Sequence, residues 1–366
     1  MPSRTARLPP AARHRTVVIA DGSVVVQGLF ARWLGDSGQF HVAAVAGDAE
    51  TALAHTARHH PDILVFDLGM GGGCPTTVLP QILERSPHTS ILLAATLNEH
   101  TTRLALECMT KGALDLVAKP DSRKGLPLTL DFRSEFLLKL DGIAEAHPSV
   151  PKRRLAETAP GPVNLRHIVS TLPRYLVIGA STGGPRAVAK VLHDMGDSLP
   201  FVTTAIVQHM PPLFTASFAE QMAAETGCPA REPHDGERLA PGTIYIAPGG
   251  RHLGIDRRLG HIVARVSDDP PVRFCRPAVD VLFADAARHL GPAALGLVLT
   301  GMGSDGTAGA SALRQAGAAV IAQDEFSSTI WGMPGSVVRA RLASAVLPLD
   351  QIGGALSHLF AGERRA

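Results

Sequence analysis

Three short segments of the sequence carry a serine, a histidine and an aspartate whose settings suit chemistry on an ester or an amide. Ser181 lies in the glycine-rich run 179–184 (GASTGG), after an apolar strand and before a helix. His209 stands at the end of another apolar run, in QHMPP, and Asp305 lies in the glycine-rich loop 299–307 (LTGMGSDGT). A hydroxyl, an imidazole and a carboxylate can supply the nucleophile, the general base and the group that orients the base in acyl transfer.

The run around Ser181 fits three roles when it is taken alone. It matches the G-x-S-x-G elbow, in which a tight turn exposes a serine hydroxyl and the following helix N-terminus offers N–H groups to an oxyanion. A turn of this kind can also hold a phosphate, although a serine stands where G-x-G-x-x-G has its second glycine and no clear acidic residue ends a strand about 20 positions on. Thirdly, Ser181 could simply cap the helix.

The other two residues add weight to the catalytic interpretation. A histidine at a strand end is commonly structural, and an aspartate before a glycine commonly makes a turn or a cap. All three residues, however, occupy equivalent places at strand ends in one domain, and together they complete a set for nucleophilic catalysis. Their chain order, Ser181, His209, Asp305, differs from the Ser…Asp…His order of α/β-hydrolases, so we expect a separate use of the same chemistry.

The composition excludes several functional classes. The formal net charge is only +2, and aromatic residues make up 4% of the chain, so neither a charge-driven nucleic-acid or membrane binder nor a base-stacking platform is expected. No apolar run approaches the roughly 18 residues of a spanning helix. The four cysteines are far apart, which predicts free thiols in a reducing compartment: Cys74, Cys108, Cys228 and Cys275. We therefore expect a cytoplasmic protein without membrane insertion.

Short apolar strands alternating with helices must position these residues. The second half of the chain predicts strands at 175–178, 203–207, 243–246, 295–299 and 319–322, and helices at 186–195, 214–225, 277–289 and 309–316. The first half predicts strands at 16–20, 41–46, 63–66, 91–95 and 114–118, with helices at 24–34 and 49–59. Continuous apolar strands separated by helices indicate parallel sheets covered on both faces.

The fold class predicted is α/β, with two doubly wound parallel-sheet domains joined by a linker. Residues 1–14 are expected to be a disordered basic tail and 15–121 the first domain. Residues 122–173, rich in Pro, Arg, Ala and Thr after one amphipathic stretch, are expected to be a linker with a helix, followed by the second domain at 174–362.

The motifs together resemble one family. GASTGGP, QHMPP and LTGMGSDG, with Asp-Gly-Glu at 235–237, IAPG at 246–249 and Gly-Met-Pro at 332–334, are similar to the chemotaxis protein-glutamate methylesterases over roughly residues 174–360. Residues 15–120 resemble a response-regulator receiver domain, the usual N-terminal partner in that family. The resemblance implies a flavodoxin-like receiver and a Rossmann-like methylesterase domain.

The same resemblance implies roles for individual residues. Ser181 would be the nucleophile, His209 the base and Asp305 the residue that orients the base, with oxyanion donors from the backbone N–H groups of Thr182 and Met302. The implied reaction is hydrolysis of glutamate γ-methyl esters on the cytoplasmic helices of a methyl-accepting chemoreceptor, and glutamine deamidation by the same route. No cofactor is expected for catalysis. The implied partners are the chemoreceptor and a histidine kinase of the chemotaxis pathway.

The receiver-like half matches part of a phosphorylation site. Asp67 corresponds to the phosphate acceptor, and Asp21 to one member of an acidic pair. Asp21 and Asp67 are therefore the candidate Mg²⁺ ligands, because that ion prefers carboxylate and other oxygen ligands. Lys119, before a proline, corresponds to the lysine that meets the phosphoryl oxygens.

Three receiver positions depart from the expected pattern. Gly22 replaces the second acid, Ala95 the hydroxyl residue of the fourth strand, and Leu116 the switch aromatic. These changes weaken Mg²⁺ binding and remove parts of the usual switch. The sequence therefore leaves two hypotheses open: a receiver phosphorylated at Asp67, and a domain that docks and blocks without switching.

Two other functions compete with the methylesterase. A degenerate receiver joined to an inactive esterase fold could act as a scaffold in a signalling complex, although a scaffold has no need for a complete serine, histidine and aspartate set. A dinucleotide-binding oxidoreductase could be built on the GASTGG turn. Titration with NAD(P) distinguishes the oxidoreductase from the methylesterase, because only the oxidoreductase should bind this cofactor.

Overall fold

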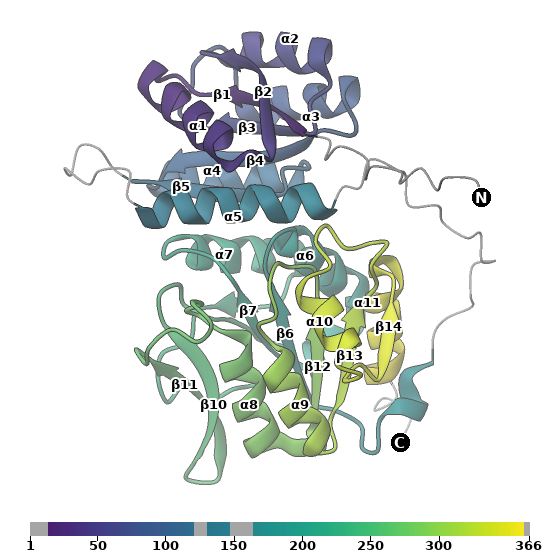
Figure 1. Ribbon diagram of the computed structural model, residues 1–366. Helices are drawn as coiled ribbons and strands as arrows, with labels where there is room; N and C mark the ends of the chain where they lie inside the picture. Colours follow the sequence, from purple (N-terminus) through teal and green to yellow (C-terminus); the bar gives the residue numbers. More distant parts are fainter. Residues whose placement is uncertain (1–13, 121–129, 147–163, 362–366) are drawn as a thin grey trace, which may run out of the picture.

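The computed structural model describes residues 14–120, 130–146 and 164–361, which form two α/β domains stacked on one another (Figure 1). The expected basic tail at 1–14, apart from its last residue, lies outside the described residues, as do residues 122–129 and 147–163 of the expected linker. Within the described ranges, no helix is both long and apolar enough to span a bilayer.

The N-terminal domain is a parallel sheet of five strands in the order β2-β1-β3-β4-β5. Every residue of β3 is buried, as expected for a strand covered on both faces. This order is the flavodoxin-like one, so the predicted doubly wound fold is confirmed for this half. The strands are β1 (Arg15–Ala20), β2 (Phe40–Ala46), β3 (Ile63–Asp67), β4 (Ser90–Thr96) and β5 (Asp115–Lys119).

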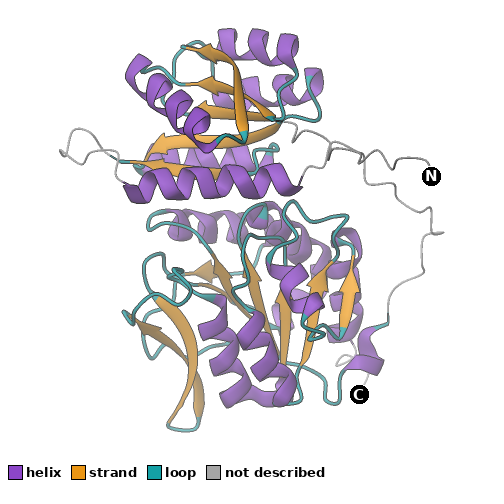
Figure 2. Cartoon of the chain, viewed as in Figure 1, coloured by secondary structure: helices purple, strands orange, loops and turns teal. Residues whose placement is uncertain are grey.

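Helices cover both faces of this sheet (Figure 2). Local capping fixes where several of them begin: Asp48 accepts a hydrogen bond from the Thr51 N–H at the start of α2, and Asn98 and Thr101 form a capping box at the start of α4. The helices are α1 (Val24–Ser37), α2 (Ala49–His59), α3 (Pro75–Arg85), α4 (Glu99–Thr110) and α5 (Leu130–Ala146).

The last of these helices, α5, falls within the segment expected to be a linker, yet it packs on the N-terminal sheet. Its buried residues Phe132, Phe136, Leu140 and Ile143 belong to the same apolar cluster as β1 and α1. The Phe136 ring stacks on Phe30 with centroids 4.5 Å apart. A hydrophobic face at helical spacing therefore makes α5 a structural part of the first domain.

The C-terminal domain has a seven-stranded parallel sheet in the order β14-β13-β12-β6-β7-β9-β8, which confirms the second predicted doubly wound sheet. Its strands are β6 (Tyr175–Ala180), β7 (Thr203–Gln208), β8 (Ala230–Arg231), β9 (Ile244–Ile246), β12 (Ala294–Val298), β13 (Ala319–Gln323) and β14 (Ala345–Leu347). The helices are α6 (Gly184–Met195), α7 (Phe214–Thr226), α8 (Val279–Leu290), α9 (Thr307–Gln315), α10 (Met333–Arg339) and α11 (Leu349–Phe360). Short 3-10 turns lie at Leu165–Ile168, Gly196–Phe201 and Gly291–Ala293.

An antiparallel hairpin of β10 (His252–Arg258) and β11 (His261–Ser267), absent from the sequence prediction, packs beside α8. Its strands interleave charged and apolar residues, so they lack the continuous apolar run that identified the parallel strands.

The two domains meet through helices and loops (Figure 1). Helix α4 of the first domain packs against α6 and α7 of the second. Helix α5 lies across the top of the C-terminal domain, and an added Cβ at its Gly142 would lie only 2.5 Å from the Met302 sulfur. The carboxyl ends of the C-terminal strands therefore face the N-terminal domain.

Candidate active site

Adjacent strands position the three chemically active residues. Strand β6 is the switch point of the C-terminal sheet, since β12 lies on one side of it and β7 on the other. Ser181 follows β6, His209 follows β7, and Asp305 lies in the loop after β12. Ligand sites of open α/β sheets form at such carboxyl edges, so the fold brings together the three loops that the sequence singled out.

The turn that carries Ser181 is held rigidly. Its N–H donates to the Thr300 carbonyl at 3.1 Å, and its carbonyl accepts from the Gln208 Nε2 at 2.8 Å. The helix beginning at Gly184 passes so close that an added Cβ there would lie 2.0 Å from the Gln208 Oε1. Glycine is therefore required, and Gln208 is a positioning residue whose role the sequence alone did not reveal.

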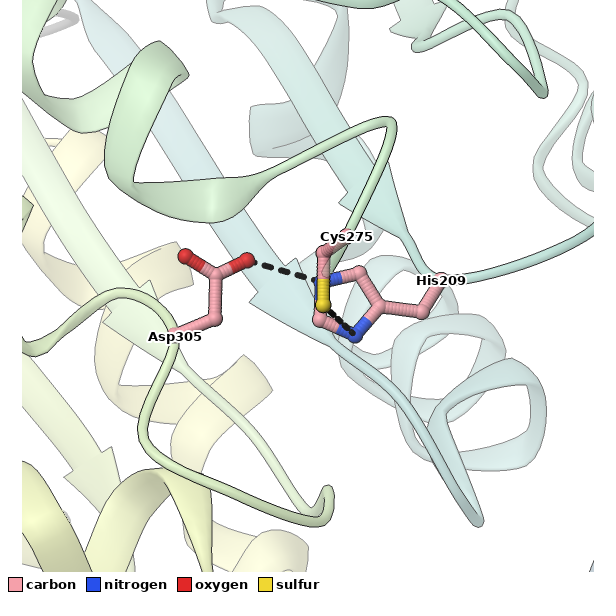
Figure 3. Close-up of side chains that lie close together, drawn as sticks. All are labelled: His209, Cys275 and Asp305. Carbon is pink, nitrogen blue, oxygen red and sulfur yellow. Dashed lines mark hydrogen bonds and ion pairs between the residues drawn. The ribbon is translucent and has the colours of Figure 1, made fainter. Parts of the chain in front are cut away.

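His209 and Asp305 are directly paired. The His209 Nε2 lies 2.8 Å from the Asp305 Oδ2 (Figure 3). The Asp305 carboxylate also accepts backbone N–H groups from Val279 at 2.7 Å, from Asp280 at 2.9 Å and from Gly306 at 2.9 Å. Burial alone would raise the pKa of the Asp305 carboxyl, but the bonds from His209 and these N–H groups lower it. A buried, ionised carboxylate thus fixes the orientation of the imidazole.

The remaining nitrogen of His209 faces a thiol. The Cys275 Sγ lies 3.9 Å from the His209 Nδ1 (Figure 3). Burial by itself would lower the pKa of the His209 imidazole, but the Asp305 hydrogen bond and the neighbouring Cys275 outweigh it and raise that pKa to about 9. The imidazole is therefore a stronger base than a free histidine, and it holds its proton at neutral pH.

Ser181 and His209 line one narrow cavity. Within the described residues, no hydrogen bond joins the Ser181 hydroxyl to His209. The cavity has a volume of ≈ 20 Å³, which leaves room for about one water molecule. Its other walls include Asp115, Leu116 and Lys139 from the first domain, so the N-terminal domain covers the site.

The two candidate oxyanion donors lie in the Ser181 turn itself and in the loop that packs against it. Neither the Thr182 nor the Met302 backbone N–H donates to another described residue. Gly301 brings the Met302 loop against the nucleophile, because an added Cβ would lie 2.8 Å from the Ser181 Cβ. Gly332 donates to the Gly301 carbonyl at 3.1 Å and supports that loop. Unpaired N–H groups beside a nucleophile can stabilise a developing oxyanion.

Two known families match most of the sequence. The CheB methylesterase family matches residues 176–356, and the response regulator receiver domain matches residues 17–130. A protein-glutamate methylesterase/protein-glutamine glutaminase of group 2 operon from Bradyrhizobium diazoefficiens is 35% identical over 95% of this chain and 94% of its own. A protein of the same name from Rhodopseudomonas palustris is 38% identical over 95% of each chain. The chain belongs to the CheB methylesterase family.

Among solved structures, the CheB methylesterase catalytic domain of Thermotoga maritima is 36% identical. It covers 52% of this chain and 100% of its own, with a TM-score of 0.49. The family assignment confirms the resemblance seen in the motifs, and it sets aside the dinucleotide-binding oxidoreductase.

In the receiver domain, Lys119 occupies the centre of the acidic pocket. Its Nζ lies 2.9 Å from the Asp21 Oδ2 and 2.6 Å from the Asp67 Oδ1. Burial, the leading cause, raises the pKa of Asp21, while Lys119 acts against that rise. The pocket therefore brings together the three receiver residues that the sequence identified.

The same pocket fits Mg²⁺ poorly. In the part of the chain that the structure describes, it offers two carboxylates, and both are engaged by Lys119. Gly22 adds no side chain, and Ala95 is buried without a hydroxyl. Leu116 is buried and lines the Ser181 cavity, so it occupies the domain interface. The usual phosphorylation site is thus incomplete in its ligands.

Nothing in the sequence indicated a charged pair, Asp115 and Lys139, at the domain interface. The Thr182 hydroxyl donates to the Asp115 carboxylate of the receiver domain, and the Lys139 ammonium donates to the same carboxylate at 2.9 Å. The Gly183 N–H donates to the Leu114 carbonyl at 3.0 Å. The residue that carries a candidate oxyanion donor is therefore bonded directly to the receiver domain.

Proposed function

We propose that this protein hydrolyses glutamate γ-methyl esters on the cytoplasmic helices of a methyl-accepting chemoreceptor, and deamidates glutamine there, with Ser181, His209 and Asp305 as a catalytic triad. The observation that carries the proposal is the 2.8 Å bond between His209 and buried Asp305, in a cavity that Ser181 shares. The names of the relatives supply the substrate class.

In the proposed mechanism, the Ser181 Oγ attacks the ester carbonyl and His209 takes its proton. Because the Nε2 is bound to Asp305, the proton goes to the Nδ1. The N–H groups of Thr182 and Met302 stabilise the tetrahedral oxyanion, each contributing about 2.7–4 kcal/mol. Methanol, or ammonia from glutamine, leaves with the proton from His209, and water then hydrolyses the glutamyl-enzyme. No step needs a cofactor.

Regulation in this proposal is steric. A cavity with room for about one water cannot admit a methyl-glutamyl side chain, so the docked receiver domain must move before substrate binds. The contacts that hold it next to Ser181 include those of Asp115 with Thr182 and of Leu114 with Gly183, in addition to the packing of α4 against α6 and α7. We therefore assign the docked arrangement to an inhibited state in equilibrium with an open one.

The signal for opening is proposed to come through the receiver domain, from a histidine kinase of the chemotaxis pathway or from the receptor itself. Asp67 is the candidate phosphate acceptor, and Lys119 would meet the phosphoryl oxygens. Because the acidic pocket lacks a third carboxylate, we expect Mg²⁺-dependent phosphorylation to be weak. The free thiols in the described part of the chain are compatible with the cytoplasm, where we place the protein.

The proposal is tested by mixing the full chain with receptor carrying isotopically labelled methyl esters and measuring labelled methanol. Wild type should release methanol, and Ser181→Ala should release it at least about a thousandfold more slowly. Ser304→Ala, which removes a hydroxyl from the neighbouring Asp305 loop, is the matched control and should retain activity. Equal release by wild type and Ser181→Ala would disprove the nucleophile, and absence of release from every variant would support the scaffold alternative.

A further inference from the structure

The catalytic pair has a third neighbour with metal-binding chemistry. One ligand atom each from His209, Cys275 and Asp305 lies within 4.8 Å of the others, and this is the one such group of three or more His, Cys, Asp or Glu residues in the ranges that the structure describes. Figure 3 shows the thiol and the carboxylate at different nitrogens of the imidazole ring. Thiolate, imidazole and carboxylate are the ligands that Zn²⁺ prefers.

The spacing of the thiol and the imidazole suits one zinc ion. With Zn–S near 2.3 Å and Zn–N near 2.05 Å at a tetrahedral angle, sulfur and nitrogen should lie about 3.6 Å apart. The Cys275 Sγ and the His209 Nδ1 are 3.9 Å apart, so a shift of a few tenths of an ångström completes the geometry. Two protein ligands leave the remaining positions to water or a hydroxyl.

The imidazole is already oriented for a metal at the Nδ1. Zinc-binding histidines commonly donate their other ring N–H to a carboxylate, which fixes the tautomer and raises the basicity of the ligand. The Asp305 carboxylate is the corresponding acceptor at the His209 Nε2, at 2.8 Å, and three backbone N–H groups also donate to it. The arrangement needed for hydrolysis is therefore also the arrangement of a carboxylate–histidine–metal set.

The loop that carries Cys275 holds the thiol in place and leaves it reachable. Val272 and Cys275 exchange backbone hydrogen bonds of 3.1 and 2.9 Å, and the two residues between them, Arg273 and Phe274, have φ angles of 50° and 65°. Such left-handed backbone is uncommon for these side chains and marks a constrained turn. The Arg273 Nε forms an ion pair with the Asp280 Oδ2 at 3.2 Å. Cys275 is half-buried.

We propose that His209 and Cys275 form an inhibitory Zn²⁺ site. On binding, the Cys275 thiol and the protonated His209 imidazole each release one proton to solvent. The thiolate and the freed Nδ1 then each donate an electron pair to the metal, and Asp305 stays on the Nε2. The ion then occupies the nitrogen that would accept the Ser181 proton. The proposal that Zn²⁺ binds here does not depend on the proposed hydrolysis. The proposal that bound Zn²⁺ inhibits the enzyme rests on that proposed function.

Cobalt titration of the full chain tests the site without an activity assay. Co²⁺ replaces Zn²⁺ in such sites, and a thiolate bound to it gives an intense near-ultraviolet charge-transfer band. We expect one equivalent of Co²⁺ to produce this band, and Zn²⁺ to abolish it. Cys275→Ser should lose the band, and Cys74→Ser, which alters an exposed free thiol elsewhere, should keep it. A band unaffected by Cys275→Ser, or none in wild type, would overturn the site.

Methanol release tests whether Zn²⁺ bound at this site inhibits the enzyme. Zn²⁺ alone should slow wild type, EDTA should restore the rate, and Cys275→Ser should need at least about tenfold more Zn²⁺, since loss of even an outer-shell partner costs 10–100-fold in metal affinity. If Co²⁺ binds through Cys275 while Zn²⁺ leaves methanol release unchanged, inhibition is refuted and His209 Nδ1 is not the base. If wild type releases no methanol at all, the proposed hydrolysis fails and the cobalt result still decides the site.

Discussion

Removing the Asp115 carboxylate should activate the enzyme, because this group bonds to both sides of the domain interface. In the docked state it accepts from the Thr182 hydroxyl and from Lys139, and the two charged side chains are only 15% and 21% exposed. In the open state the same Asp115–Lys139 pair lies in water, where an ion pair is worth about 0–1 kcal/mol. Asp115→Ala therefore acts mainly on the docked state.

The magnitude follows from the bond that is lost. A hydrogen bond to a charged group contributes about 1.5–3 kcal/mol, and each 1.4 kcal/mol changes an equilibrium tenfold. The open fraction should therefore rise by roughly 10- to 150-fold until the open state predominates, and methanol release should rise with it.

The assay is the initial rate of methanol release from methylated receptor, with small-angle scattering to follow domain separation. Asp36→Ala is the matched control, because it removes an acid on α1 whose ion pairs with Arg32 and Arg133 are 4.0 and 3.6 Å long and exposed. The control should behave as wild type. A folded Asp115→Ala protein with wild-type rate and wild-type scattering would refute the assignment of the docked state as inhibited.

Three further predictions address the base, the receiver pocket and substrate contact. The value of kcat/KM should increase about tenfold per pH unit up to a pKa of about 9, because only neutral His209 accepts a proton. A kcat/KM that does not change above pH 7 would contradict the role of His209 as the base. Gly22→Asp should tighten Mg²⁺ binding by at least about tenfold in calorimetry, since the nearest atom to an added Cβ is 3.9 Å away; unchanged affinity would show that the missing acid is not the defect. Phe274→Ala should raise KM about tenfold with kcat unchanged, because this exposed ring stands beside the site in left-handed backbone. The control Leu259→Ala, equally exposed at the far turn of the β10–β11 hairpin, should leave KM unchanged.

What the sequence could predict depended on local signals. Glycine turns after apolar strands marked Ser181 and Asp305, and a Pro-Pro stop marked His209, because strand ends and tight turns leave a pattern in neighbouring residues. The parallel sheets were predictable for the same reason, and the structure confirms them.

Contacts between distant segments left no such signal. Cys275 reaches His209 across 66 residues through a turn of left-handed residues that ordinarily avoid that conformation. Asp115 meets Thr182 only because the two domains dock, and docking depends on the shapes of both surfaces. The contact of Lys139 could not be predicted, because Lys139 lies in a segment expected to be a linker, whereas its helix packs on the first sheet. Tertiary geometry, rather than local pattern, determined these contacts.

The central claim is that Ser181 and His209 act as one catalytic unit, and a double-mutant cycle tests it most directly. Methanol release would be compared among wild type, Ser181→Ala, His209→Ala and the double variant. Residues of one triad are strongly non-additive, so the double variant should be no slower than the slower single variant. Multiplicative losses, with the double variant slower by the product of the two single effects, would contradict the account.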